Sequence, residues 1–279
     1  MKVLVTGVSG QLGFDVMREL LARGIEAKGA SRSDFSLTDF AAMRRFVEAH
    51  RPTAIIHCAA YTAVDKAEDE PELCHEVNAA ATGELARLAK EIGAKFLYIS
   101  TDYVFPGTGE DFYEPEDEKA PCNVYGESKL LGEEAALEAL EELFIVRISW
   151  VFGENGKNFI KTMLRLAETH EELSVVGDQI GSPTYTRDLA RLLADMIETR
   201  KYGVYHATNE GICSWAELAA EALRCAGKKT RVKAIKTEEY PTKAKRPKNS
   251  RLSKKCLDDA GFSRLPDWRD AVARYVELI

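Results

Sequence analysis

Short apolar runs alternate with amphipathic stretches along the first half of the chain. Strands are expected at 2–6, 25–30, 53–60, 95–100 and 143–149, and helices at 14–22, 40–50, 74–93 and 125–140. Apolar strands that alternate with helices predict a parallel sheet that is buried on both faces. The fold class is therefore α/β, with a Rossmann-like doubly wound parallel sheet.

The pattern becomes less regular after Gly153. It predicts helices at 158–167, 186–198 and 214–225, short strands at 173–176 and 204–206, and a last helix from Asp267. We therefore expect a cofactor-binding domain at 1–150 and a smaller, mainly substrate-binding lobe at 151–279, with helix 186–198 packed back on the sheet. A cleft between two such parts is the usual place for a ligand.

Composition narrows the class of protein. The 279 residues are 45% hydrophobic and 30% charged, as in a soluble globular protein, and the net charge of -7 argues against nucleic-acid binding. Residues 228–255 differ, because they carry twelve Lys and Arg against Glu238 and Glu239. Most of these cations are expected in solvent, and a few are candidates for contact with an anionic small molecule.

The cysteines and the N-terminus bear on the compartment. Six cysteines are scattered without a C-x-x-C pair, which indicates reduced thiols in a cytoplasmic protein rather than disulfides or a zinc site. The chain enters a strand directly after Met1, without the pattern of a signal peptide. No apolar run approaches the ~18 residues that span a membrane, so no membrane partner is expected.

A glycine-rich turn joins the first strand to the first helix. Gly7, Gly10 and Gly13 stand in this turn, where glycine lets the backbone approach a pyrophosphate at the helix N-terminus. The spacing is G-x-x-G-x-x-G, and an ordinary strand–helix turn is the weaker alternative. Ser31 and Arg32 follow the second strand and suit a 2′-phosphate, which favours NADP; Asp34 and Asp39 leave NAD open.

Polar side chains gather where later strands end. The third strand ends in the small residues Ala59 and Ala60, which permit close approach of a ligand. Thr101, Asp102 and Tyr103 follow the fourth strand, and Trp150 follows the fifth. Strand capping and core packing are common alternative roles for such residues.

Tyr125 and Lys129 lie one turn apart at the start of a helical pattern. An ammonium favours the phenolate, so we expect the pKa of Tyr125 to be lowered toward neutrality. Chance produces this spacing in many helices, and its weight as a site depends on the surrounding motifs.

Seven motifs in order give the chain a resemblance to the dTDP-4-dehydrorhamnose reductases, which are extended short-chain dehydrogenases/reductases. They are Thr6-Gly7-x-x-Gly10-Gln11-Leu12-Gly13, residues 59–68, residues 100–105, Tyr125-x-x-x-Lys129, residues 149–153, residues 178–184 and residues 249–252. The resemblance covers essentially the whole chain.

The resemblance implies a set of site residues. The catalytic set is Thr101, Tyr125 and Lys129. The cofactor would contact Gly7, Gly10, Gln11, Leu12, Gly13, Ser31, Arg32, Leu37, Cys58, Ala59, Ala60, Tyr61, Tyr125 and Lys129. The sugar would contact Thr62, Val64, Thr101, Asp102, Tyr103, Tyr125 and Trp150.

The implied reaction is reduction of dTDP-4-dehydro-β-L-rhamnose to dTDP-β-L-rhamnose by NADPH, with NADH left open as the reductant. A dTDP-sugar is the expected partner, a homodimer is left open, and the basic segment is a candidate wall for the diphosphate. Ser36 departs from the acid that the family often carries beside the adenine. Some members use a metal at a dimer contact, and Asp15 lies in the region involved, but the remaining ligands are not identified in this sequence, so no metal is predicted.

Two alternatives remain open at this point. One is another nucleotide-sugar reductase, epimerase or dehydratase of the same superfamily, and Asp102 after Thr101 does not exclude it. The other is a non-catalytic, NADP-binding regulatory subunit, against which the intact Thr101, Tyr125 and Lys129 argue.

Overall fold

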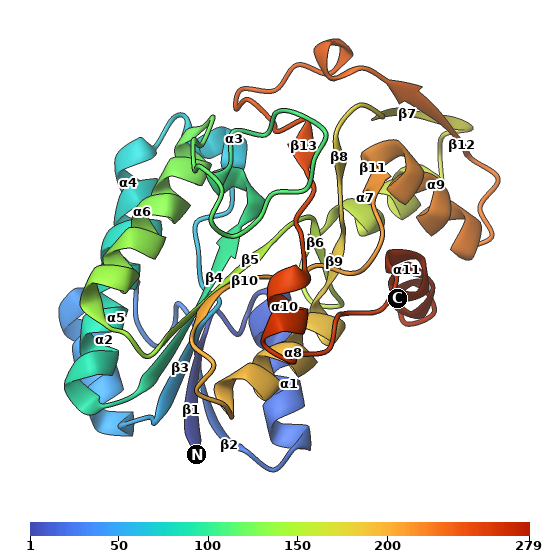
Figure 1. Ribbon diagram of the computed structural model, residues 1–279. Helices are drawn as coiled ribbons and strands as arrows, with labels where there is room; N and C mark the ends of the chain where they lie inside the picture. The colour runs from blue at the N-terminus through green and yellow to red at the C-terminus, as the bar shows by residue number, and fades with distance from the viewer.

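The computed structural model describes residues 1–279 and contains a six-stranded parallel sheet in the order β10-β5-β4-β3-β1-β2 (Figure 1). Its strands are β1 (Lys2–Thr6), β2 (Glu26–Ala30), β3 (Ala54–His57), β4 (Lys95–Thr101), β5 (Leu143–Ile148) and β10 (Gly203–His206). The α/β doubly wound class is confirmed. The chain reverses direction of winding at β1, so the carboxyl ends of β1, β3 and β4 border one crevice.

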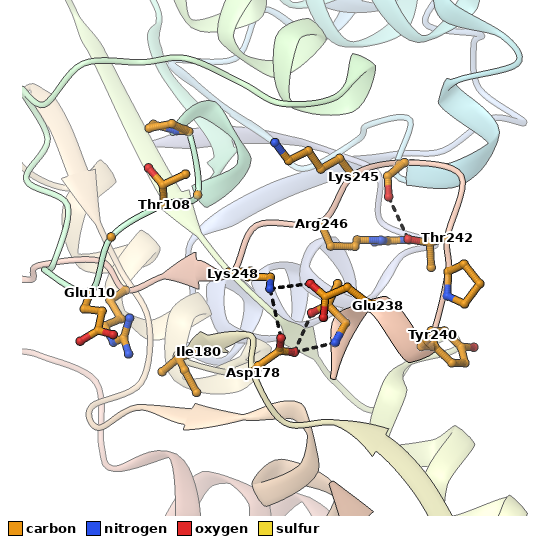
Figure 2. Close-up of a pocket in the computed structure, with 17 residues that line it drawn as sticks. Thr108, Glu110, Asp178, Ile180, Glu238, Tyr240, Thr242, Lys245, Arg246 and Lys248 are labelled. Atoms are coloured by element: carbon orange, nitrogen blue, oxygen red, sulfur yellow. Dashed lines mark hydrogen bonds and ion pairs between the residues drawn. The ribbon is translucent and has the colours of Figure 1, made fainter. Parts of the chain in front are cut away.

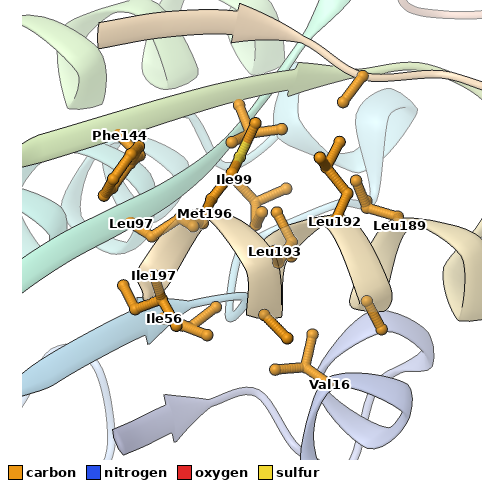
Figure 3. Close-up of a cluster of buried hydrophobic side chains, with 14 of the residues drawn as sticks. Val16, Ile56, Leu97, Ile99, Phe144, Leu189, Leu192, Leu193, Met196 and Ile197 are labelled. Carbon is orange, nitrogen blue, oxygen red and sulfur yellow. The ribbon is translucent and has the colours of Figure 1, made fainter. Parts of the chain in front are cut away.

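Helices cover both faces of this sheet (Figure 1). On one face α1 (Gln11–Ala22) and α8 (Thr186–Ile197) pack on Val5, Ile56, Leu97 and Phe144, as Figure 3 shows for the core around Leu193 and Met196. On the other face lie α2 (Phe40–His50), α5 (Ala81–Ile92) and α6 (Val124–Ala139). The expected return of the helix near 186–198 to the sheet is confirmed.

Three expected elements differ most from the structure. The strand predicted at 204–206 is β10, and it pairs with β5 in the main sheet instead of belonging to the small lobe. The strand predicted at 53–60 ends at His57. The helix predicted at 74–93 is preceded by α3 (Val64–Ala67), begins at Pro71 as α4 (Pro71–His75), and passes through a π-helical turn, η1 (Glu76–Ala80), into α5.

The smaller lobe is built from short paired strands and three helices. The pairs are β6 (Val151–Phe152) with β9 (Thr184–Tyr185), β7 (Glu172–Val176) with β12 (Arg231–Ile235), and β8 (Ile180–Gly181) between β11 (Cys213–Ser214) and β13 (Asn249–Ser250). The helices α7 (Phe159–Leu166), α9 (Trp215–Cys225) and α11 (Trp268–Val276) enclose a core around Phe152 and Trp268. Short turns η2 (Asp102–Val104) and η3 (Thr237–Glu239) and helix α10 (Lys255–Asp259) complete the chain.

None of the helices combines the length and the apolar character that crossing a membrane requires.

Candidate active site

The glycine-rich turn has the shape that a dinucleotide requires. Gly7 has φ +72, and a Cβ there would lie 2.7 Å from the backbone nitrogen of Ala59. A Cβ at Gly13 would lie 2.4 Å from the Gly7 carbonyl oxygen, so α1 can approach β1 this closely only with glycine. Gly10 caps α1 without a side-chain hydrogen bond, which leaves the first N–H groups of Gln11 and Leu12 to a ligand. These residues fit a bound pyrophosphate.

The segment after β2 places its polar groups differently from the expectation for NADP. The Ser31 backbone N–H and hydroxyl both donate to Asp34 Oδ2, at 2.8 and 2.9 Å. These hydrogen bonds lower the pKa of Asp34. Arg32 is exposed, and Leu37 packs on the core beneath α2. Asp34 is thus the acid at this strand end, and Ser31 already has an anionic partner.

The loop after β3 is tied to the central helix by a residue that the sequence analysis did not single out. Asn78, in the π-helical turn, accepts from the Tyr61 N–H at 2.8 Å and donates to the Tyr61 carbonyl at 3.0 Å and to Ser128 Oγ at 2.9 Å. The backbone carbonyl of Asn78 accepts hydrogen bonds from the Thr82 and Tyr98 hydroxyls. Asn78 therefore fixes the Cys58–Tyr61 loop against α6; an asparagine within an alanine-rich helical run was the only available signal.

Helix α6 brings the three expected catalytic residues together with Tyr103. Asn123 caps α6 by accepting from the Gly126 N–H at 2.8 Å. A Cβ at Gly126 would lie 2.3 Å from the Tyr103 carbonyl oxygen, so this glycine allows η2 to touch the helix. The rings of Tyr103 and Tyr125 meet edge to face at 5.5 Å. Thr101 and Lys129 are both buried, and the Thr101 hydroxyl hydrogen-bonds with Tyr125.

The pKa of Tyr125 contradicts the expectation. The Lys129 ammonium donates to the Ile99 carbonyl at 2.7 Å and lies 4.0 Å from the centre of the Tyr98 ring. Burial raises the pKa of Tyr125 above its ordinary value, with the Thr101 hydroxyl acting in the opposite direction. The predicted lowering by Lys129 is therefore wrong for this arrangement. Burial also lowers the pKa of Lys129 to about 7.

Thr101 is paired with its neighbour in the chain. Its hydroxyl donates to Asp102 Oδ1 at 2.9 Å, while the Tyr103 N–H donates to Thr101 Oγ1 at 3.2 Å. Burial raises the pKa of Asp102 to about 6, and Asp102 Oδ2 has no hydrogen-bond partner. A threonine hydroxyl has one hydrogen, so Thr101 can donate to a substrate only when this hydrogen leaves Asp102.

Trp150 stands at the carboxyl end of β5 in a strained backbone conformation. Its φ of 50 is rare for a bulky residue and is typical of functional positions. The indole stacks on Trp215 at 3.9 Å, and a Cβ at Gly181 would lie 3.0 Å from the Trp150 ring. Ser149 donates to the Ser182 carbonyl at 2.6 Å and so anchors this strand end. Trp215, which the sequence analysis did not single out, thus forms one aromatic wall with Trp150.

An arginine from the basic segment reaches the Tyr103 side of the site. Arg246 donates to the Tyr103 hydroxyl at 3.3 Å and to Asp65 Oδ2 at 2.8 Å. Asp65 belongs to α3, which begins at Val64, two residues after the exposed Thr62. Arg246 therefore links the loop after β3 with η2, although it is far from both in the sequence.

A polar pocket of about 700 Å³ opens beside Arg246. Figure 2 shows Lys248 directed toward Asp178 and Glu238, to which its distances are 3.3 and 2.7 Å. Thr101, Tyr125 and Trp150 do not line this pocket, and Arg246 connects it with Tyr103. The cations that line it are Lys245, Arg246, Lys248 and Arg251. The remaining cations of residues 228–255 lie outside it.

The structure holds no group of three or more His, Cys, Asp or Glu side chains that is arranged for a metal ion. Asp15, the residue considered for this role, is buried in α1. It pairs with Arg18 at 2.7 Å and accepts a hydrogen bond from the Thr186 hydroxyl. Burial raises the pKa of Asp15, while Thr186 and Arg18 act in the opposite direction.

A parallel Rossmann-like sheet with a glycine turn, and a helix that presents Tyr and Lys four residues apart beside a strand-end Thr, define the extended short-chain dehydrogenases/reductases. Within that class the chain belongs to the family described as RmlD substrate binding domain, whose model matches residues 1–279. The resemblance found in the sequence is confirmed.

Curated relatives and solved structures agree with this family. The chain is 40% identical to the Escherichia coli dTDP-4-dehydrorhamnose reductase, covering 98% of this chain and 96% of the relative. It is also 40% identical to the spore coat polysaccharide biosynthesis protein SpsK of Bacillus subtilis, over 99% and 97% of the two chains. The solved Bacillus anthracis dTDP-4-dehydrorhamnose reductase in complex with NADP is 41% identical, with a TM-score of 0.97 and full coverage of both chains.

Proposed function

We propose that the protein is an NADPH-dependent oxidoreductase that reduces dTDP-4-dehydro-β-L-rhamnose to dTDP-β-L-rhamnose, the last step of dTDP-L-rhamnose biosynthesis. The observation that carries this proposal is the convergence of Thr101, Tyr125 and Trp150 at one end of the sheet, in a chain that matches the family along its whole length. Nucleotide sugars and NADPH are both cytoplasmic metabolites, so we place the reaction there.

The glycine turn and the loop after β3 would hold NADPH. The backbone of Gly7, Gly10 and Gly13 leaves the space for its pyrophosphate, and the Cys58–Tyr61 loop, fixed by Asn78, would lie against its nicotinamide half. When bound, NADPH supplies the hydride that reduces the sugar ketone. Ser31 would have to exchange its bond to Asp34 for one to the 2′-phosphate, which is why NADH remains a competent alternative in our proposal.

Tyr125 is the proton donor to the ketone oxygen. Negative charge develops on this oxygen as the carbonyl is reduced, and a positioned acid meets it. The raised pKa keeps Tyr125 protonated at neutral pH, ready to donate. Lys129, whose ammonium does not lower the pKa of Tyr125 in this arrangement, would hold the nicotinamide ribose. Thr101 supplies a second hydrogen bond to the same oxygen.

The sugar would lie between the aromatic wall and η2. Trp150 and Trp215 offer a flat apolar surface to one face of the sugar and its methyl group. Asp102 and Tyr103, with Thr62 and Val64 from the loop after β3, would contact its hydroxyls. The polar pocket beside Arg246 is where the dTDP diphosphate would lie, because four cations line it against the three acids Glu110, Asp178 and Glu238, and its volume of about 700 Å³ is in the range for a bound ligand.

The experiment is a coupled assay in which the substrate is made enzymatically from dTDP-glucose. The purified protein should then consume NADPH, followed by its near-ultraviolet absorbance, and produce dTDP-rhamnose, identified by mass and by NMR. NADH is tested in parallel. Binding of NADPH without turnover of any dTDP-sugar would contradict the proposal and favour a non-catalytic binding subunit.

A further inference from the structure

A buried ion pair lies directly behind the proposed catalytic lysine. Glu133 on α6 and Arg147 on β5 are only 3% and 2% exposed at their side chains. Arg147 Nε donates to Glu133 Oε1 at 2.9 Å and a terminal nitrogen donates to Oε2 at 2.7 Å, while Ser100 donates to Oε1 as well. A two-point contact of this kind fixes the carboxylate in one orientation. Nothing in the proposed reaction uses this pair directly.

Arg147 makes two further contacts besides its ion pair with Glu133. Its second terminal nitrogen donates to the Pro115 carbonyl at 2.9 Å and lies 3.4 Å from His206 Nε2. His206 Nδ1 faces the Ser253 carbonyl at 3.1 Å, so this nitrogen carries the hydrogen and Nε2 accepts from Arg147. Burial lowers the pKa of His206 to about 3, which keeps it neutral. The position of Arg147, and through it that of Glu133, is therefore fixed by the Pro115 carbonyl and by His206.

Glu133 follows Lys129 by one turn of α6, and the two side chains contact adjacent residues of β4: Lys129 donates to the Ile99 carbonyl, and Glu133 accepts from Ser100. The other titratable groups around the ammonium are neutral near pH 7. His57 on β3 has its pKa lowered to about 3, and burial raises the pKa of Cys58 to about 12 and that of Cys74 above its ordinary value. Tyr98 offers the face of its ring. Glu133 is thus the negative charge that favours the ammonium.

We propose that Glu133 is a positioning residue that keeps Lys129 in its ammonium form beside Tyr125, and that Arg147 limits this effect while it fixes the carboxylate. Burial opposes the charge on Lys129, and the negative Glu133 is the largest influence in the opposite direction. This inference rests on the proposed function, since it needs Lys129 to act in turnover. It assigns a role to a residue that would touch neither the sugar nor NADPH.

The test uses the dependence of kcat/KM for NADPH on pH, at saturating sugar, because this parameter reports groups of the free enzyme. With the wild-type protein we expect an alkaline limb near pH 7, where Lys129 loses its proton. In Glu133→Gln the limb should move down by about one pH unit or more, because the favourable charge is lost and Arg147 is left unpaired. In Arg147→Met the alkaline limb should move to higher pH, because Arg147 no longer offsets the negative charge of Glu133.

The opposite directions of the two pH shifts distinguish an electrostatic role of Glu133 from a purely structural one. Both substitutions break the same buried pair, so a purely structural role would lower kcat and the melting temperature in both without moving the limbs apart. Glu133→Asp keeps the charge and should retain a limb near that of the wild type. If a single variant does not fold, Glu133→Gln/Arg147→Met, which leaves no unpaired charge, carries the test, and its limb should lie below that of the wild type.

The inference would be overturned if the alkaline limb of kcat/KM stayed at the same pH in these variants, or moved in the same direction in Glu133→Gln and Arg147→Met. The proposed function would still stand in that case, provided that the wild type turns over the dTDP-sugar. Absence of turnover of the dTDP-sugar by the wild type would instead overturn the proposed function itself.

Discussion

The groups around α6 and the groups around the polar pocket are held by different kinds of interaction. Lys129, Thr101 and Glu133 are almost fully buried, and each has hydrogen-bond partners within the main sheet, α6 or η2. Lys248 is half exposed and is held by ion pairs with Asp178 and Glu238. Buried pairs fix geometry, whereas exposed pairs contribute little energy and exchange partners readily. The first region is suited to proton transfer and the second to taking up and releasing an anionic nucleotide.

The largest effect should follow from removal of the proton donor. Tyr125→Phe keeps the ring and its edge-to-face contact with Tyr103 but loses the hydroxyl. We expect kcat to fall about 10²–10⁴-fold, the usual contribution of a positioned acid. The dissociation constant for NADPH, measured by fluorescence titration, should change little. A kcat near that of the wild type would show that another group supplies the proton.

Substitutions of the groups around the polar pocket should change KM for the sugar nucleotide. Arg246→Ala removes the charge that links Tyr103 with Asp65, and we expect KM for the sugar nucleotide to rise about 10–100-fold, since a hydrogen bond to a charged group contributes ~1.5–3 kcal/mol. Lys248→Ala is the matched control in the same pocket. Its side chain is 52% exposed and already paired with two acids, so KM should change less than about fivefold. Equal effects of the two variants would contradict the role of Arg246.

The smallest effect should come from the support of the aromatic wall. Gly181→Ala would place a Cβ 2.8 Å from Ser250 Cβ and 3.0 Å from the Trp150 ring. We expect a loss of about 1–3 kcal/mol in the free energy of unfolding, and a rise in KM for the sugar below about tenfold as Trp150 shifts. Gly24→Ala is the control, because Gly24 has φ +69 with no atom within 4 Å. It should lower stability through backbone strain alone and leave KM unchanged.

Sequence patterns predicted the features that depend on residues close together in the chain. Apolar runs located all six sheet strands, although the run at 204–206 was expected in the smaller lobe, and Tyr125 and Lys129 marked the start of α6. Tertiary pairing decided the rest: β10 joins β5 across about sixty residues, and Trp215 reaches Trp150 from another helix. The direction of the Lys129 ammonium depends on the Ile99 carbonyl, which no spacing within α6 reveals.

The central claim is that the groups around α6 serve proton transfer and that the groups around the polar pocket bind the nucleotide. A double-variant cycle tests it most directly, with kcat/KM for the dTDP-sugar measured in the wild type, Tyr125→Phe, Arg246→Ala and the double variant. Independent roles predict that the loss in the double variant equals the product of the two single losses, within the ~0.3–0.5 kcal/mol seen for uncoupled sites. A double variant no worse than Tyr125→Phe alone would contradict the claim, because it would show that Arg246 acts through the proton donor.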